Sequence, residues 1–287
     1  MLKINTIYIS YFILFLTLIA KHEVSDLASK IQQKSEVLPE QLYSLYLPRM
    51  EFQKVNSSTN SIIFEETFEG EKPLSSIVGI QTATPHSYQL VTNPVFRGSK
   101  AGKLELRHND PMVHNGTRAE LFVTDRPTNK ERWYSFAVYF PSEKYACDAS
   151  SEVISQWWQT AHSTQATSLR VREDRLILRT GSDPDLLQEI DLGPLLKDSW
   201  QEFVFHFVHS DGGDGLIEIW RDGRKILTQK GGNMYKLDLP YWKLGLYKAK
   251  WNKSETDTKL RVLYLDNIRV GSEHAGLNIM QTINEAP

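Results

Sequence analysis

The sequence has a single cysteine, Cys147, among 287 residues, so no disulfide can form within the chain. The fold must therefore rest on a hydrophobic core. The sequence also lacks an excess of charge of either sign. Its formal net charge of -2 therefore neither favours nor excludes an acidic partner. The composition, 40% hydrophobic and 24% charged, is ordinary for a globular protein. One all-β domain of about 200 to 250 residues would account for most of the chain.

Long apolar runs are absent except for residues 7–20, which lie between Lys3 and Lys21. This pattern predicts a secretory signal peptide over residues 1–20. An uncleaved membrane anchor is the alternative, because no small-x-small cleavage site is evident, although the run is short for a transmembrane helix. We expect bacterial export, and hence a secreted or periplasmic protein. Residues 21–60 end in a polar stretch and are interpreted as a tether.

A long amphipathic helix is also missing after residue 60, where short apolar or alternating runs recur between turn residues. Phe203, Phe205 and Phe207 alternate, for example, before the turn at residues 210–215. This pattern of short runs separated by turns predicts an all-β domain over residues 61–275, a jelly roll or concanavalin-like sandwich of two antiparallel sheets. A loose tail is expected over residues 276–287. The expected strands are 62–68, 87–91, 103–107, 117–123, 132–140, 152–159, 167–171, 175–180, 201–209, 215–221, 241–248 and 260–270.

The aromatic stretch at residues 241–251 is the first candidate for a functional strand. Side chains alternate along a strand, so Lys243, Gly245 and Tyr247 share one face, with the lysine and the tyrosine roughly 13 Å apart. Gly245 would leave bare backbone between them, where a ligand could lie close to the sheet. The alternative is a half-buried amphipathic strand with a snorkelling lysine. The surrounding segment, 236–253, has five lysines and one acid, so it is net +4 and suits a polyanion.

Two further stretches add polar residues of the same kind. Arg118 and Glu120 share a strand face, where the carboxylate could hold the guanidinium in a fixed pose; an exposed ion pair is the simpler interpretation. Gln156 and Trp158 share a face opposite to Trp157. An amide can donate to a substrate carboxylate and an indole can stack on a sugar ring, but most tryptophans belong to the core.

Together these stretches resemble the three signature strands of jelly-roll polysaccharide lyases. The residues that carry the resemblance are Arg118-Ala119-Glu120-Leu121, Gln156 and residues 241–247, followed in the wider sequence by 104–107, 133–136, 140–142 and 264–269. In alginate lyases the corresponding strands are roughly Arg-x-Glu-Leu-Arg, Gln-x-His and Tyr-Phe-Lys-x-Gly-x-Tyr. The surrounding sequence is more similar to heparin lyases and glucuronan lyases. The resemblance spans residues 62–271.

The resemblance implies β-elimination on a uronic-acid polysaccharide, with no redox cofactor. Arg118 and Gln156 would neutralise the uronate carboxylate and stabilise the enolate-like intermediate. Tyr247 would transfer the proton, as base toward C5 or acid toward the leaving O4. Lys243 would hold the substrate and favour the ionised phenol. Additional substrate contacts are expected from Glu120, Trp158, Lys248 and Lys250.

One departure from the family pattern concerns the base. The pattern usually has a histidine two residues after the glutamine, and Trp158 stands in that place. Imidazole exchanges a proton near neutral pH and indole does not. His114, four residues before Arg118, is the best substitute, followed by His162; either could simply be solvated. Tyr247 alone, acting as base and acid on one face of the sugar, is the remaining option.

The same residues bear on other classes of function. A β-glucanase is rejected, because Glu189 and Asp191 are followed by Gly193 and Pro194 where the second acid is needed. A non-catalytic carbohydrate-binding protein derived from a lyase is the main alternative, since seven tryptophans suit a stacking platform. A structural or adhesive sandwich would leave the polar residues without a shared purpose. The expected partner is an anionic polysaccharide rather than nucleic acid, with membrane contact only through an uncleaved N-terminal segment, and the protein is expected to be a monomer.

Cofactor chemistry is not expected. Structural calcium is the one exception, because residues 211–214 and Asp266 with Asn267 supply oxygen ligands. Such Asp-Gly clusters are more often plain turns.

Overall fold

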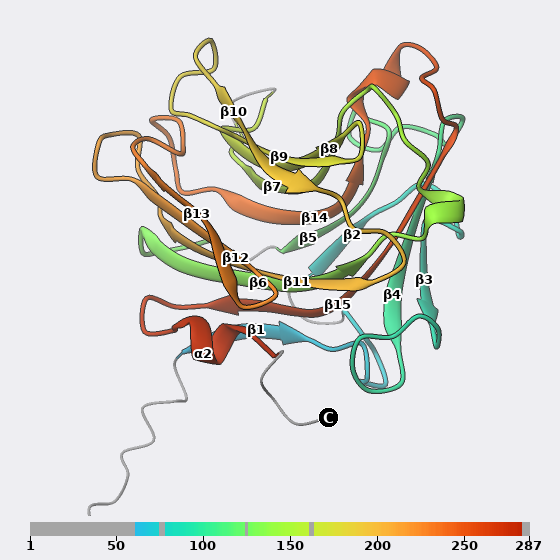
Figure 1. Cartoon of the computed structure of the whole chain (residues 1–287), viewed down its shortest axis with the longest axis horizontal. Helices are drawn as coiled ribbons and strands as arrows, with labels where there is room; N and C mark the ends of the chain where they lie inside the picture. Colours follow the sequence, from blue (N-terminus) through green and yellow to red (C-terminus); the bar gives the residue numbers. More distant parts are fainter. Residues whose placement is uncertain (1–60, 75–77, 124–125, 161–163, 283–287) are drawn as a thin grey trace, which may run out of the picture. The chain divides into compact units, whose positions relative to one another are not determined.

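Two antiparallel β-sheets packed face to face form the described part of the chain (Figure 1). The computed structural model describes residues 61–74, 78–123, 126–160 and 164–282. The predicted signal peptide or anchor (1–20) and tether (21–60) lie outside these residues. Within the described part, no helix is long and apolar enough to cross a membrane. The expected all-β sandwich is confirmed.

Eight strands form the first sheet, in the order β13-β12-β11-β6-β15-β4-β3, with β1 also paired to β15. These strands are β1 (Ile62–Glu66), β3 (Tyr88–Val91), β4 (Ala101–Arg107), β6 (Glu131–Tyr139), β11 (Trp200–Val208), β12 (Leu216–Arg221), β13 (Arg224–Lys230) and β15 (Leu260–Gly271).

Seven strands form the second sheet, in the order β10-β9-β8-β7-β14-β5-β2. They are β2 (Val78–Gln81), β5 (Arg118–Val123), β7 (Glu152–Trp158), β8 (Thr167–Arg172), β9 (Arg175–Thr180), β10 (Gln188–Pro194) and β14 (Tyr241–Tyr247). The short helices are η4 (Ser142–Lys144), η5 (Ala249–Asn252) and α2 (Leu277–Met280).

Aromatic side chains fill the space between the sheets. The alternating phenylalanines Phe203, Phe205 and Phe207 of β11 are fully buried. Two of them meet Trp157 of the opposite sheet, whose ring centre lies 4.4 Å from that of Phe207 and 5.1 Å from that of Phe205. Burial of such large rings stabilises the sandwich without any disulfide.

The strands that sequence analysis missed are all at sheet edges. β2, β10 and β13 each end one of the two strand orders, and most of their residues are exposed or half-buried. An edge strand with little burial has no reason to alternate apolar and polar residues, so its pattern is weak. The Asp222-Gly223 turn before β13 has φ of 51° and 75°, as a two-residue hairpin requires.

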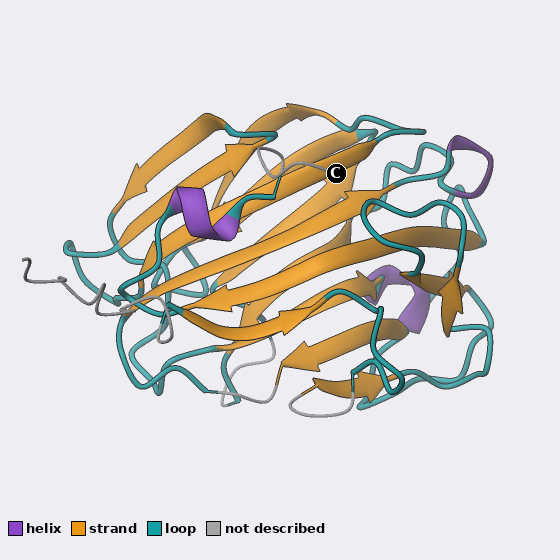
Figure 2. Ribbon diagram, turned by 90° about the horizontal axis from the view of Figure 1, so that it is seen from below, coloured by secondary structure: helices purple, strands orange, loops and turns teal. Residues whose placement is uncertain are grey.

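The prediction of a loose tail is wrong for residues 276–282. Helix α2 lies on the outer face of the eight-stranded sheet (Figure 2). Its buried Met280 packs in a cluster with Trp133 and Trp220. Beyond it, the backbone N–H of Thr282 donates to the Glu202 carboxylate at 2.7 Å. The segment therefore belongs to the folded domain.

Candidate functional site

The face of the seven-stranded sheet that points away from the core carries the predicted site residues. In the register of β5, β14 and β7, Lys243 lies opposite Phe122 and Gln156, and Tyr247 lies opposite Arg118. Directly opposed residues of antiparallel strands point to the same face. Three segments far apart in the sequence thus bring their polar side chains together.

A cleft of about 740 Å³ lies over this face. It is lined by Gly79, Ile80, Gln81, His114, Asn115, Arg118, Phe122, Gln156, Trp158, Gln165, Lys243 and Tyr247. The cleft therefore contains all five residues expected to be catalytic, together with Trp158. Its size is that of a pocket that holds a small molecule or a few sugar residues.

Glu120 organises one side of the cleft from beneath. Its carboxylate accepts a hydrogen bond from Arg118 Nη1 at 2.9 Å and another from the Gln156 amide. Only 1% of Glu120 is exposed, and burial raises its pKa against the opposing effect of Arg118 and Lys243. Glu120 therefore orients Arg118 and Gln156 and does not reach a ligand, which corrects its predicted role in substrate contact.

Arg118 and Tyr247 stack at one end of the cleft. The guanidinium carbon lies 4.5 Å from the ring centre of Tyr247, and the Arg118 Nε–H is buried with no acceptor among the described residues. Gly116 makes this contact possible, because a Cβ there would lie 2.6 Å from Arg118 Nη2 and 2.8 Å from Tyr247 Cε2. A planar cation with spare donors beside a phenol can hold a carboxylate next to a proton-transfer group.

Lys243 occupies the other end, among aromatic rings. Its ammonium lies 4.4 Å from the ring centre of Trp158 and 5.1 Å from that of Phe122, and it donates to Gln81 Oε1 at 3.1 Å. Burial lowers the pKa of Lys243; Glu120 opposes this shift and Arg118 adds to it. Trp158 thus contributes an apolar wall to the cleft, while Trp157 is buried in the core, as the alternation predicts.

His114 enters the cleft from a tight turn. Val113 and Gly116 exchange two backbone hydrogen bonds, and the two residues between them, His114 and Asn115, have φ of 47° and 59°. A positive φ is unfavourable for a histidine, so the turn holds this side chain at the cleft at some conformational cost. His162, the second candidate, lies outside the described residues.

The predicted role of Gly245 is wrong. Gly245 does not line the cleft, and its φ of 129° is accessible mainly to glycine. A Cβ there would lie 2.9 Å from Leu104 Cδ1 of the opposite sheet, on the core side. Between Leu244 and Tyr247 the pairing with β7 shifts, so the glycine serves a bulge that sets the direction of Tyr247 rather than a gap for substrate.

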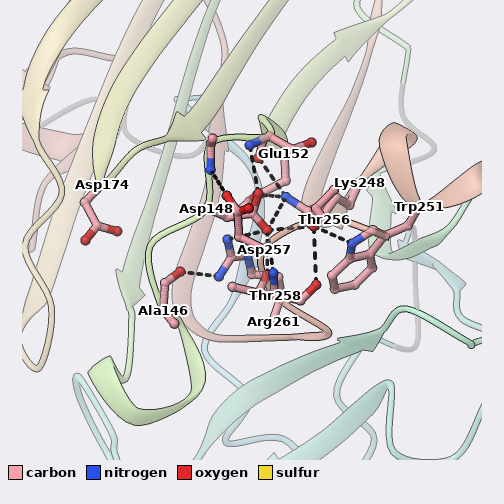
Figure 3. A network of polar contacts seen from close by, with 12 residues as sticks. Ala146, Asp148, Glu152, Asp174, Lys248, Trp251, Thr256, Asp257, Thr258 and Arg261 are labelled. Carbon is pink, nitrogen blue, oxygen red and sulfur yellow. Dashed lines mark hydrogen bonds and ion pairs between the residues drawn. The ribbon is translucent and has the colours of Figure 1, made fainter. Parts of the chain in front are cut away.

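Lys248 and Lys250 do not contact the cleft either. The ammonium of Lys248 is fully buried between Glu152 at 2.7 Å and Asp148 at 3.3 Å, in a network that also contains Arg261 (Figure 3). Lys250 is exposed on η5 and does not line the cleft. Part of the local positive charge is therefore neutralised by buried carboxylates directly after Tyr247 and does not face a ligand.

Metal ligands do not gather in the described part of the chain, where no three His, Cys, Asp or Glu residues lie close enough to share an ion. Asp266 is buried and accepts hydrogen bonds from the backbone N–H groups of Phe96 and Arg97. Asp214 accepts one from Ser210. These carboxylates serve the backbone and a turn.

Several cleft residues were missed from the sequence. Phe122 shares the alternation of Arg118 and Glu120 and could have been found from it. Gln81 could not, because its edge strand has no clear pattern, and Gln165 comes from a loop. Arg170 of β8 and Arg179 of β9 each lie between buried residues in the sequence, so alternation places both arginines on the cleft face. This pattern could have been recognised from the sequence and was missed.

The architecture and the cleft define a concanavalin-like β-sandwich with a polar, cation-rich site on one sheet. The sequence profile of the polysaccharide lyase family matches residues 46–269, and the chain belongs to this family. No curated protein sequence is significantly similar to the chain.

Solved structures share the fold at low sequence identity. The endo-β-1,4-glucuronan lyase from the fungus Trichoderma reesei is 18% identical, with a TM-score of 0.61 over 74% of this chain and 96% of that one. The cellulose induced protein Cip1 is 15% identical, with a TM-score of 0.53 over 74% and 98%. The receptor binding domain of botulinum neurotoxin type G is 11% identical, with a TM-score of 0.50 over 77% and 50%.

Proposed function

We propose that the protein is a secreted polysaccharide lyase that cleaves a uronic-acid polysaccharide by β-elimination. The observation that carries this proposal is the convergence of Arg118, Gln156, Tyr247, Lys243 and His114 on one cleft, in a member of the polysaccharide lyase family. Glucuronan is the first substrate to test, because a glucuronan lyase shares the fold.

The proposed reaction begins with the uronate carboxylate held at Arg118. Arg118 has an Nε–H without an acceptor among the described residues, and the Gln156 amide has a second N–H besides the one that donates to Glu120. In the proposed complex these two groups would donate to the carboxylate. Their donors stabilise the negative charge that develops when the C5 proton leaves.

Proton transfer falls to Tyr247 and His114. A base takes the C5 proton, the C5–H electron pair forms the C4=C5 double bond, the C4–O4 bond breaks, and an acid returns a proton to O4. Tyr247 lies against Arg118 and is therefore next to the carbon that bears the carboxylate. His114, which lines the same cleft, is the second proton-transfer group. Lys243 and Trp158 would hold the sugar chain at the other end.

The test is the absorbance of the unsaturated uronate over time on glucuronan, heparin, heparan sulfate, alginate and chondroitin. We expect a rise on one polymer and a loss of about 10²- to 10⁴-fold in Tyr247→Phe. Tyr241→Phe, a matched change on the same strand outside the cleft, should keep full activity. No rise on any polymer would refute the lyase proposal.

A sugar-binding protein without activity is the second candidate. Trp158 stands where related lyases usually have a histidine, and Phe122 and Trp158 form an aromatic platform around Lys243. Binding of one polymer without turnover, unchanged in Tyr247→Phe, would establish this function instead.

A further inference from the structure

The cleft face of the sheet continues beyond Gln156 onto β8 and β9. Val153 is paired with Tyr247 on one side and with Arg170 on the other. Neighbouring strands are about 4.8 Å apart, so Arg170 lies two strands, roughly 10 Å, from Tyr247. Arg179 follows on β9, and Figure 1 shows these strands side by side in the curved sheet. A ligand that crosses the strands from Arg118 would pass over both arginines.

Arg170 and Arg179 are half-buried and share one neutral acceptor. Their Nη2 atoms donate to the same oxygen, Gln165 Oε1, at 3.2 and 3.3 Å. The other hydrogen bonds of Arg170 go to the hydroxyls of Ser168 and Ser151, and the Arg179 Nε–H is buried without an acceptor. Neither guanidinium forms an ion pair within the part of the chain that the structure describes.

The neighbouring arginines of the same two strands show the contrast. Arg172 is bound to Glu189 at 2.9 Å, and Arg175 is bound to Asp191 at 2.5 Å. Each outer arginine is thus in contact with a carboxylate, whereas the inner pair has Glu189 nearby, opposite Arg179 in the register, but that carboxylate forms its ion pair with Arg172. Burial and the adjacent Arg179 lower the pKa of Arg170 to about 9, and the attraction of Glu189, which is itself bound to Arg172, opposes only part of that shift.

We propose that Arg170, Arg179 and Gln165 form an oxyanion subsite for a carboxylate or sulfate group on a second sugar of the polymer. This proposal rests on the proposed function, because it places the first uronate at Arg118. Two forked guanidiniums with free N–H groups fit a planar carboxylate or a sulfate. Gln165 lines the cleft as well, so the subsite is continuous with it. The substrate is then a polymer with negative charge on more than one sugar near the cleaved bond.

The test measures calorimetric binding of β-1,4-linked oligoglucuronates and heparin oligosaccharides, from two to six sugars, to the Tyr247→Phe protein. Affinity should increase when the oligosaccharide becomes long enough to reach the arginine pair. Arg170→Gln and Arg179→Gln should each reduce the affinity for the longer oligosaccharides by about tenfold or more. The affinity for the shortest oligosaccharide should not change. The kind of oligosaccharide that shows the gain distinguishes carboxylate from sulfate.

Arg175→Gln is the matched control, because it removes one positive charge from the same face at an arginine that already has a partner. It should leave the length dependence unchanged. Equal weakening by all three variants would mean that only overall charge matters and would overturn the subsite.

A second measurement separates this proposal from the lyase proposal. Inorganic sulfate is titrated while the side-chain Nε–H signals of the arginines are followed by NMR. The signals of Arg170 and Arg179 should shift together and those of Arg175 should not. If no uronate polymer is bound or cleaved but these shifts occur, the lyase proposal fails and the oxyanion subsite stands; without the shifts, the subsite is refuted whatever the activity.

Discussion

Glu120 illustrates how single residues set the chemistry of the cleft without touching a ligand. Its carboxylate is buried and is held by donors from Arg118 and Gln156. An ion pair on the surface of a sheet contributes little, but a buried one holds both partners in one geometry. The simpler interpretation of Arg118 and Glu120, an exposed pair, is therefore wrong.

Gly116 is the residue whose substitution should separate activity from folding. Its φ is not in the left-handed region, so Gly116→Ala is compatible with the backbone, but the new methyl group would displace Arg118 or Tyr247. We expect kcat/KM to fall by about tenfold to a hundredfold, because small misplacements of reacting groups are costly. Thermal unfolding should change little. Gly70→Ala, where nothing lies within 4 Å, is the control and should leave both quantities unchanged.

At the scale of elements, the segment that follows β14 holds the site in place. The backbone N–H of Lys248 donates to Thr117 O at 3.1 Å, and Asn252 Oδ1 of η5 accepts from Thr117 N at 2.7 Å. The side chain of Lys248 is in turn held by buried ion pairs with Asp148 and Glu152 (Figure 3). The start of β5 and the end of β14, where Arg118 and Tyr247 meet, are thereby joined.

Removing the Lys248 ammonium should destabilise the domain. Lys248→Met leaves Arg261 as the one cation among the described residues that is paired with Asp148 and Glu152. Removing one partner of a buried ion pair costs about 3–5 kcal/mol. Lys250→Met, at an exposed lysine on η5, should change the free energy of unfolding by less than about 0.5 kcal/mol. Denaturant titration measures both. Equal midpoints for the two variants would contradict a structural role for the network.

At the scale of the whole molecule, two buried carboxyl groups give opposite dependences of stability on pH. Burial alone raises the pKa of Asp148, but hydrogen bonds from Thr258 and Thr256 outweigh it and hold that pKa at about 2. For Asp266, burial outweighs the hydrogen bonds from Arg97, Asn267 and Phe96 and raises the pKa to about 6. An unfolded aspartate has a pKa of about 3.9.

The free energy of unfolding should reflect both groups. The stabilisation from Asp148 is complete above about pH 4 and is lost as the pH falls toward 2, on the order of 2 kcal/mol. The contribution of Asp266 is complete below about pH 4 and is lost as the pH rises toward 6, because the folded state favours its protonated form. In Asp148→Asn the free energy of unfolding should depend less on pH between about 2 and 4. In Asp266→Asn it should depend less on pH between about 4 and 6. Denaturant titrations across pH 2 to 7 would show this, and unchanged slopes in the variants would contradict the assignment.

Much of the fold could be predicted because buried strands have a strong pattern. Phe203, Phe205 and Phe207 alternate since one face of β11 lies against the opposite sheet. Edge strands such as β2 and β10 have little burial to impose such a pattern, and they were missed. The prediction of a loose tail failed for a related reason. Met280 is a single apolar residue, and the sequence does not reveal that it packs against Trp133 and Trp220 on the outer face of the sheet.

The sequence by itself determined the sandwich and the resemblance to polysaccharide lyases. It also assigned Arg118, Gln156, Lys243 and Tyr247 to one face of a sheet, because side chains alternate between the two faces along a strand. Only the tertiary structure decided which charges are free to act. In the sequence Lys248 and Arg170 are simply two cations, yet the structure places Lys248 between two carboxylates and gives Arg170 no ion pair with any described residue. The difference comes from strand register and burial, which set the distances between charges, and no local pattern encodes them.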